Sequence, residues 1–211
     1  MAELPKAAFP KTKPPATSRI LDRWISDKAL PLKETPGRGM TIREARSDEL
    51  AILQDIELAA GRRFAEVGME EVADDEPLSL EALRHYQSDG RAWVAVDDLD
   101  RPVAYLVAEL VDGNTHIEQV SVRSDHAHKG AGRALIEQVA TWAAERGMPA
   151  LTLTTFADVP WNAPYYERCG FRRLSESELT PGLRDKRECE AALGLDRWPR
   201  VCMRRTLPPE R

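Results

Sequence analysis

The chain has 211 residues, of which 42% are hydrophobic and 31% are charged, so it can form one sizeable hydrophobic core or at most two small ones. The net charge is −5, and residues 40–171 alone carry 24 Asp and Glu against 12 Lys and Arg. This acidic body argues against nucleic acid as the main partner, because phosphate contacts need clustered Lys and Arg, and it suits a cationic substrate.

Targeting signals and metal-ligand patterns are not visible in the sequence. No apolar run reaches the length of about 18 residues typical of a membrane span, and the N-terminal stretch does not resemble a secretory signal. We therefore expect a cytoplasmic protein without a membrane partner. The three cysteines are far apart in sequence and the four histidines are scattered, so we predict neither a disulfide framework nor a metal site.

Residues 1–39 differ in composition from the remainder of the chain. They contain six of the fifteen prolines, and their apolar residues show no sustained period except in a short stretch around Ile20 to Ile25. We predict a partly disordered extension with one short helix that docks on the body of the protein. An upstream start or a targeting arm would explain the same composition.

From Met40 the sequence is strongly patterned. A strand is predicted at residues 40–46, followed by a helix at residues 50–64 for which Asp48 is the expected N-cap. Residues 66–77 form an acidic loop, and Ser79 caps a helix that ends at Asp89-Gly90. Three strands with short turns follow at residues 91–96, 103–110 and 115–122, which predicts an antiparallel meander.

A glycine-rich loop at residues 123–132 leads into the next helix, which is predicted to end at Gly147. Gly130 and Gly132 lie at the N-terminus of this helix, where backbone N–H groups lack partners and the helix dipole is positive. Glycines there give an anion close access to the backbone, although any strand-to-helix turn can use them. The chain lacks the P-loop pattern, and Leu135 stands where a dinucleotide fingerprint needs its third glycine.

The loop resembles the acyl-CoA pyrophosphate loop of the GNAT superfamily of N-acetyltransferases. That pattern is Arg or Gln, two residues, Gly, any residue, then Gly or Ala; Gly130-Ala131-Gly132 fits its second half, while Ala127 departs from its first position. The resemblance runs from about Met40 to Thr206 and includes the strand at residues 150–156. It also includes the segment NAPYYERCGFRRL, whose Tyr166 is followed after three residues by Gly-Phe.

The resemblance implies a mixed α/β fold, in which an antiparallel meander is followed by a βαβα unit and two central parallel strands splay apart. It implies a single domain over residues 40–206 with a tail at 207–211. Acetyl-CoA is the expected cofactor, with CoA as product and no metal, and its pantetheine arm would lie between strands 115–122 and 150–156. The cofactor-binding residues implied are Val120, Ser121, Val122, His128, Lys129, Gly130, Ala131, Gly132, Arg133 and Asn162.

Catalysis needs a neutral amine, because a protonated alkyl amine with a pKa near about 10.4 cannot attack a thioester. Strand alternation places His116 and Glu118 on one face, beside Val120 and Val122. Family members carry bases at the equivalent strand positions, so Glu118 is our first candidate and His116 our second. A solvent-facing polar pair is the alternative interpretation.

The expected acid is Tyr166, since the family's tyrosine before Gly-Phe protonates the departing thiolate; packing in the core is its alternative role. Asn162 is predicted to cap the final helix; the asparagine that contacts the cofactor in many family members lies further upstream of the tyrosine. Cys169 beside a helix-ending glycine is interpreted as a packing residue. These assignments imply direct transfer in a ternary complex without a covalent intermediate.

The acceptor is predicted to be the primary amine of a small cationic molecule. Six acidic residues between Glu66 and Glu76 would suit it, although such runs are usually solvated surface. Trp161 and Trp198 could wall the acceptor pocket, and the insertion at residues 179–198 is expected to shape specificity or a homodimer contact. Two alternatives stay open: acetylation of proteins or peptides, and a catalytically silent regulator that binds acyl-CoA.

Overall fold

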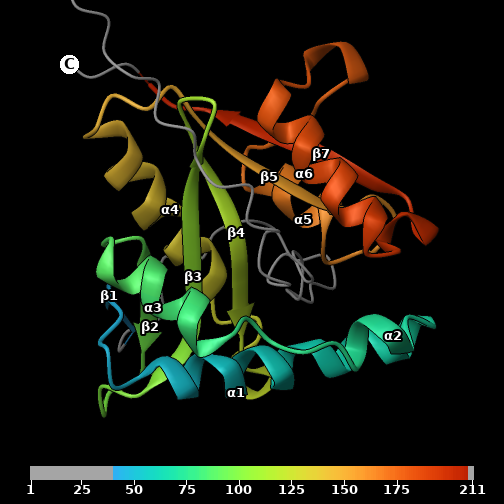
Figure 1. The fold of residues 1–211 in the computed structure, drawn as a ribbon. Coiled ribbons are helices and arrows are strands. Elements are labelled where there is room, and N and C mark those ends of the chain that lie inside the picture. Colours follow the sequence, from blue (N-terminus) through green and yellow to red (C-terminus); the bar gives the residue numbers. More distant parts are fainter. Residues whose placement is uncertain (1–39, 209–211) are drawn as a thin grey trace, which may run out of the picture.

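The computed structural model describes residues 40–208, so the predicted extension of residues 1–39 and most of the predicted tail lie outside the described residues (Figure 1). The strands are β1 (Thr41–Glu44), β2 (Ala92–Val96), β3 (Pro102–Val111), β4 (Asn114–Val122), β5 (Ala150–Phe156), β6 (Arg172–Arg173) and β7 (Arg200–Thr206). The helices are α1 (Leu50–Gly61), α2 (Glu70–Ala73), α3 (Leu80–Ser88), α4 (Ala131–Ala144), α5 (Ala163–Arg168) and α6 (Pro181–Ala192).

The strands form one mixed sheet in the order β1-β2-β3-β4-β5-β7-β6. Strands β2, β3 and β4 are the predicted antiparallel meander. Asp112 and Gly113 turn the chain from β3 into β4, and both have positive φ angles, as a two-residue hairpin of this twist requires. The mixed α/β fold predicted from the sequence is therefore confirmed.

Strands β4 and β5 are parallel and separate soon after they begin. Their only pairs are Thr115 with Leu151 and His116 with Thr152, and Figure 1 shows the two strands diverging beyond this point. The edge of β4 that faces β5 is therefore not paired with β5 from Ile117 onward. This is the splayed arrangement that the resemblance implies, and it places the edge of β4 from Ile117 onward beside a gap instead of beside β5.

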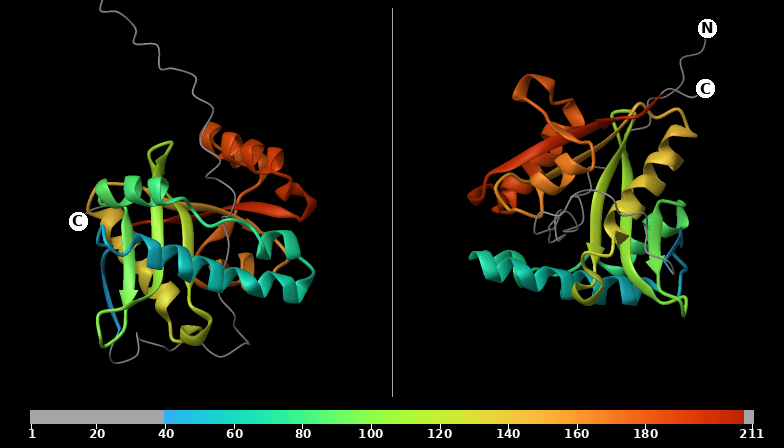
Figure 2. Two further views of the ribbon diagram at one scale, coloured as in Figure 1. Left: turned by 60° about the horizontal axis from the view of Figure 1, so that its bottom comes forward. Right: turned by 180° about the vertical axis from the view of Figure 1, so that it is seen from behind.

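Helices cover both faces of the sheet. Leu53 and Ile56 of α1 and Leu83 of α3 pack with Tyr105 and Val107 on one face. The opposite face packs against α4 and α5, which Figure 2 shows from behind. Residues that alternate along β3 therefore enter two different cores, as expected for a strand buried on both sides.

A β-bulge at Glu118 corrects the predicted facing of β4. Val107 pairs with Gln119 and Ala108 pairs with Ile117, so Glu118 is an extra residue in the ladder. Val120 and Val122 consequently face the α4 core, whereas Glu118 contacts α6 on the opposite face. Simple alternation had placed Glu118 with Val120 and Val122, and the inserted residue is the reason that this prediction was wrong.

Several local predictions also need correction. Helix α1 begins at Leu50 as predicted, but its N-cap residue is Glu49 and not Asp48; the Glu49 carboxylate is bound by Arg43 and by the backbone N–H of Arg46. The predicted acidic loop contains the short helix α2, and the insertion at residues 179–198 contains α6. The predicted Ser79 cap is confirmed, since its Oγ accepts a hydrogen bond from the Ala82 N–H. Within residues 40–208, no helix combines the length and apolar character needed to cross a bilayer.

Candidate active site

The glycine loop before α4 has the backbone geometry of an anion site. His128 and Gly130 both have positive φ angles, of 61° and 80°, so successive N–H groups turn toward one side. A Cβ built on Gly130 would meet no heavy atom within 4 Å, which shows that the space above the loop is open. The first amides of the 14-residue helix α4 follow directly, so the loop fits a pyrophosphate held by backbone donors.

A cavity of about 280 Å³ adjoins this loop, and Ala127 and His128 line it together with Val122. Arg63, from the 3-10 turn Arg62–Val67 after α1, lines the same cavity and stacks 4.3 Å from the centre of the Trp161 ring. The guanidinium therefore supplies a cation beside the position where Ala127 departs from the family pattern. Sequence reasoning missed Arg63, because it lies more than sixty residues upstream of the loop.

Glu118 lies two residues beyond the last pair of β4 with β5, at the apex of the gap between the strands. Its side chain is buried, and its Oε2 lies 2.5 Å from the Nζ of Lys186 on α6. The same ammonium group contacts the carboxylate of Glu109 on β3. Two carboxylates thus share one lysine at the point where the strands part.

His116 shares the face of Glu118 but has a different environment. It is fully buried, its Nδ1 lies 2.9 Å from Thr152 Oγ1, and its Nε2 has no hydrogen-bond partner among the described residues. Burial lowers the pKa of His116 to about 4, while the nearby Glu190 carboxylate acts in the opposite direction. The imidazole is therefore neutral at physiological pH.

A cavity of about 770 Å³ opens in front of Glu118, between α3, the β3–β4 hairpin and α6. Tyr86 and Lys186 line it, and burial raises the pKa of the Tyr86 hydroxyl well above its ordinary value, helped by the Glu118 carboxylate. The cavity is lined by five carboxylates and one lysine. The acidic side chains that line it are Glu81, Glu109, Asp112, Glu118 and Asp185.

Tyr166 lies on α5 and is 1% exposed, within the core that α4 and α5 share with β4. It packs edge-on against Tyr165 and Phe171. Burial raises the pKa of Tyr165, whose hydroxyl also interacts with the thiol of Cys169. Tyr165 and Cys169 are therefore partners within this core.

Asn162 precedes α5 as predicted, but its side chain does not cap the helix. Its Nδ2 donates a hydrogen bond of 3.1 Å to Thr155 Oγ1 on β5. The amide therefore ties the start of α5 to the strand that borders the gap. Asn162 is thus the N-cap residue by position, as predicted, while its side-chain amide bonds Thr155 instead of the helix backbone.

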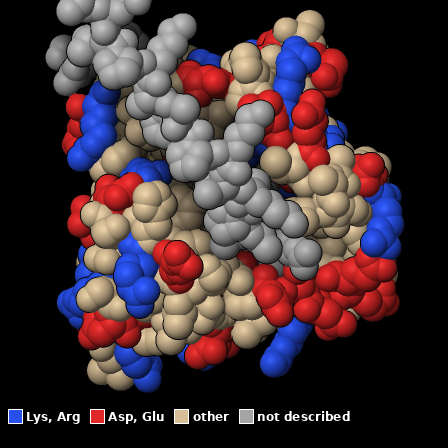
Figure 3. Space-filling model, in the orientation of Figure 1, with Lys and Arg blue, Asp and Glu red and all other residues tan. Residues whose placement is uncertain are grey.

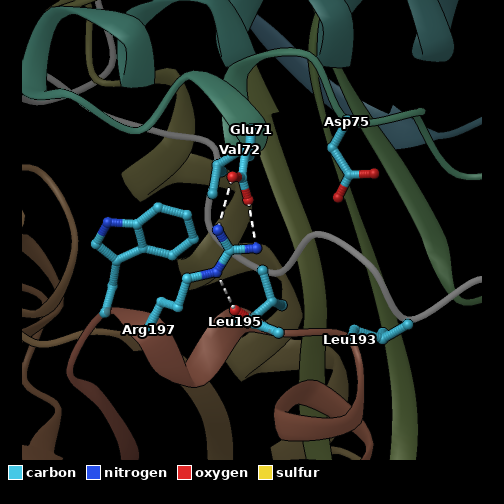
Figure 4. Close-up of a pocket in the computed structure, with 8 residues that line it drawn as sticks. Glu71, Val72, Asp75, Leu193, Leu195 and Arg197 are labelled. Atoms are coloured by element: carbon cyan, nitrogen blue, oxygen red, sulfur yellow. Dashed lines mark hydrogen bonds and ion pairs between the residues drawn. The ribbon is translucent and has the colours of Figure 1, made fainter.

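Glu71 and Asp75 of the acidic segment around α2 line a cavity of about 170 Å³ together with Trp198. Figure 3 shows acidic side chains gathered over α2, and Figure 4 shows Glu71 of this segment reaching Arg197. The two Arg197 nitrogens lie 2.6 and 2.5 Å from the Glu71 oxygens. Trp161 belongs to a core cluster, and Trp198 packs against it. The larger acidic cavity at Glu118 is a separate one, built from α3, β3 and α6.

The α6 residues that contact β3 and β4 were not identified from the sequence. Lys186 and Glu190 lie one helical turn apart, and Glu190 accepts hydrogen bonds from the buried Arg200 at 2.9 Å. Arg187 and Thr154 also contact the Glu190 carboxylate. The i, i+4 spacing of a lysine and a buried glutamate was the available signal, but it is common on exposed helices as well.

The chain is similar both to a family of proteins and to individual solved structures. The family model described as "Acetyltransferase (GNAT) family" matches residues 54–171, which is more than half of the chain. The crystal structure of the ribosomal-protein-S18-alanine N-acetyltransferase from Escherichia coli is similar, with a TM-score of 0.56 and 19% identity over 82% of this chain and 96% of that one.

Two further similar structures were determined with coenzyme A. N-acetylglutamate synthase from Neisseria gonorrhoeae, also bound to N-acetyl-glutamate, has a TM-score of 0.60 and 16% identity over 83% of this chain but only 36% of that longer one. The PaiA N-acetyltransferase from Thermoplasma acidophilum has a TM-score of 0.56 and 13% identity over 79% of this chain and 98% of that one.

Proposed function

The chain belongs to the GNAT acetyltransferase family, and from this premise we propose that it transfers the acetyl group of acetyl-CoA to the primary amine of a small cationic molecule. As an acyl-CoA-dependent acetyltransferase, it needs a site for the thioester and a second site for the acceptor. The acidic cavity in front of Glu118 is the observation that supports a cationic acceptor.

Acetyl-CoA supplies the activated acetyl group when it is bound. The amides of Gly130 to Arg133 suit its pyrophosphate, together with Lys129 and the backbone of His128 and Ala131. The edge of β4 at Val120, Ser121 and Val122, which borders the gap instead of pairing with β5, suits the pantetheine arm. Arg63 would take over the side-chain contact that Ala127 cannot make.

Glu118 accepts the proton of the acceptor amine in this proposal. It lines the acidic cavity and lies at the apex of the splayed strands, whereas His116 is fully buried. A base must reach the proton that it removes, so this difference in access favours Glu118 over His116. A cationic acceptor would take the place that the Lys186 ammonium holds in contact with Glu118.

Tyr166 donates a proton to the departing CoA thiolate. The spacing of Tyr166 to Gly170-Phe171 supports its choice over the neighbouring Tyr165. The attack is direct, within a ternary complex of enzyme, acetyl-CoA and amine. Asn162 positions the start of α5, and hence Tyr166, through its bond to Thr155.

A free-thiol assay of CoA release tests this function with polyamines, amino acids, aminoglycosides and lysine peptides as acceptors. Glu118→Gln should lower kcat by about 100-fold or more, the usual range for loss of a general base. Tyr166→Phe should lower kcat with little change in the Kd for acetyl-CoA measured by calorimetry. Glu188→Gln, at an exposed position of α6 outside the cavity, is the matched control and should retain activity.

The acceptor panel also separates the alternatives. Turnover with lysine peptides alone would replace the small-molecule acceptor by a protein. Tight binding of acetyl-CoA without turnover of any amine would contradict catalysis and support a silent acyl-CoA-binding regulator. If Glu118→Gln retained full kcat, the base would have to be another group.

A further inference from the structure

Lysine is rare in residues 40–211. From Met40 to the end, the sequence has two lysines, Lys129 and Lys186, against 20 arginines. Arginine keeps its proton in proteins and cannot act as an amine nucleophile, whereas lysine can lose its proton when it is buried. Lys129 lies exposed in the glycine loop, so Lys186 is the lysine that lines the acidic cavity.

The surroundings of Lys186 resemble those that an acceptor amine requires. Its Nζ lies 2.5 Å from Glu118 Oε2 and also contacts the carboxylate of Glu109, and the lysine side chain is only 16% exposed. Tyr86 of α3 lines the cavity from the other side. Burial lowers the pKa of Lys186 to about 8, opposed by Glu190 and Cys189 on its own helix. The two contacting carboxylates also favour the charged form, and Glu118 can receive the proton directly.

We propose that Lys186 is an internal acceptor and is acetylated by its own active site. The inference rests on the proposed function, because it uses Glu118 as the base and the gap between β4 and β5 as the site of the thioester. It goes beyond that function by assigning a modification site on the enzyme itself. The helix α6 keeps this amine beside the base without a binding step, which favours reaction by proximity.

The chemical step balances without any additional reactant. The Lys186 ammonium gives a proton to the Glu118 carboxylate, and the free amine attacks the thioester carbonyl of acetyl-CoA. A C–N bond forms, the C–S bond breaks, and the CoA thiolate takes a proton from Tyr166. The second proton on nitrogen passes to solvent, and proton exchange with solvent restores Glu118 and Tyr166 to their starting states. The products are CoA and N-acetyl-Lys186.

Acetylation would change the charge of the cavity. The neutral amide could no longer balance Glu109 and Glu118, so the cavity would attract cations more strongly. A cationic acceptor that occupies the position of the Lys186 ammonium would also compete with the internal reaction. Self-acetylation should therefore be slower in the presence of a good acceptor amine.

The test is incubation of the full chain with acetyl-CoA, followed by peptide mass spectrometry and by a free-thiol assay in the same samples. We expect acetylation of Lys186 at a first-order rate that does not change when the enzyme is diluted tenfold. Glu118→Gln should lower this rate at least tenfold. In the absence of added amine, Lys186→Arg should lower CoA release to the amount that acetylation of the other amines of the chain accounts for. Acetylation of the exposed Lys129 should be the same in the wild type and in Glu118→Gln, which makes it an internal control.

The outcomes separate this inference from the proposed function. If added amines are acetylated while Lys186 stays unmodified, self-acetylation is wrong and the proposed function stands. If Lys186 is modified equally fast in Glu118→Gln, the reaction is uncatalysed surface chemistry and the inference also fails. If neither Lys186 nor any amine is acetylated although acetyl-CoA binds, both proposals fail. Intact secondary structure by circular dichroism in each variant keeps these comparisons valid.

Discussion

His116 and Glu118 stand two residues apart on β4, yet their surroundings give them different chemistry. Glu118 lines an acidic cavity and contacts a lysine, whereas His116 is enclosed between the sheet and α6. The bulge places Glu118 and the neighbouring Gln119 opposite the single residue Val107. A bulge of this kind redirects a side chain at a functional site, and here it brings the carboxylate to the apex of the splayed strands.

The buried imidazole of His116 predicts a pH dependence of folding stability. Its pKa is about 4 in the folded protein and about 6.5 in an unfolded chain. Between these values the unfolded state binds the proton and the folded state does not, so stability falls as the pH falls from 6.5 to 4. The full difference corresponds to about 3 kcal/mol, and stability from this group is constant above pH 6.5.

Urea unfolding at several pH values between 7 and 4 measures this effect. Replacement of His116 by Gln should make the free energy of unfolding less dependent on pH in that window. The exposed His85 on α3, replaced by Gln, is the matched control and should leave the profile unchanged. An identical slope in the wild type and in His116→Gln would show that the imidazole does not remain neutral in the folded protein.

At the scale of elements, the period of apolar residues predicted most of the fold. Helix α3 with its Ser79 cap, the meander and the glycine loop before α4 all follow from local chemistry that the sequence displays. The bulge at Glu118 could not be predicted, because it depends on the register between two strands. The role of α6 was also hidden, since Lys186 and Glu190 become informative only when β3, β4 and β7 are brought beneath them.

The proposed role of the loop before α4 in cofactor binding can be tested by replacing Gly130, with the same replacement at Gly147 as the control. Gly130 and Gly147 lie near opposite ends of α4, both have positive φ angles, and a Cβ would meet no heavy atom within 4 Å at either position. Replacement of either by Ala should cost about 1 kcal/mol of stability through backbone strain. Only Gly130→Ala should also weaken acetyl-CoA binding, by about tenfold or more, because its Cβ stands over the proposed pyrophosphate amides.

Calorimetric titration with acetyl-CoA and urea unfolding separate the two effects. A comparable loss of stability in Gly130→Ala and Gly147→Ala would show that the two substitutions introduce similar backbone strain. Weaker binding in Gly130→Ala alone would then locate the pyrophosphate at this loop. Equal affinities in the two variants would place the cofactor phosphates elsewhere.

At the scale of the whole molecule, the splayed strands divide the sheet into two halves that few backbone bonds connect. One half contains β1 to β4 and the other contains β5, β7 and β6, and they are paired only at Thr115 and His116 with their partners on β5. Side chains make the remaining connections on the face of α1. Lys186 joins α6 to β3 and β4, and Arg197 joins the end of the insertion to α2 (Figure 4). These contacts hold the two halves together across the gap.

An aromatic cluster provides the apolar part of this connection. Phe64, which follows α1, packs edge-on against Phe156 of β5 and Trp161, with ring centres 5.6 and 6.1 Å apart. The cluster also includes Val72 and Leu195 from the two segments that the Arg197 ion pair links. We therefore expect that loss of Phe64 destabilises the β5–β7 half more than it destabilises the meander.

Replacement of Phe64 by Ala should lower the free energy of unfolding by about 3–5 kcal/mol, because the side chain is fully buried and its loss leaves a cavity. The milder Phe64→Leu should cost about 1 kcal/mol, which protects the test if the alanine variant does not fold. Hydrogen exchange should quicken in β5 and β7 before it does in β2 and β3, since the cluster contains Phe156 of β5 and no residue of β2 or β3. Leu58→Ala, at an exposed site on α1, is the control and should change neither measurement appreciably. Uniform acceleration throughout the sheet would instead mean that the two halves unfold as one cooperative unit.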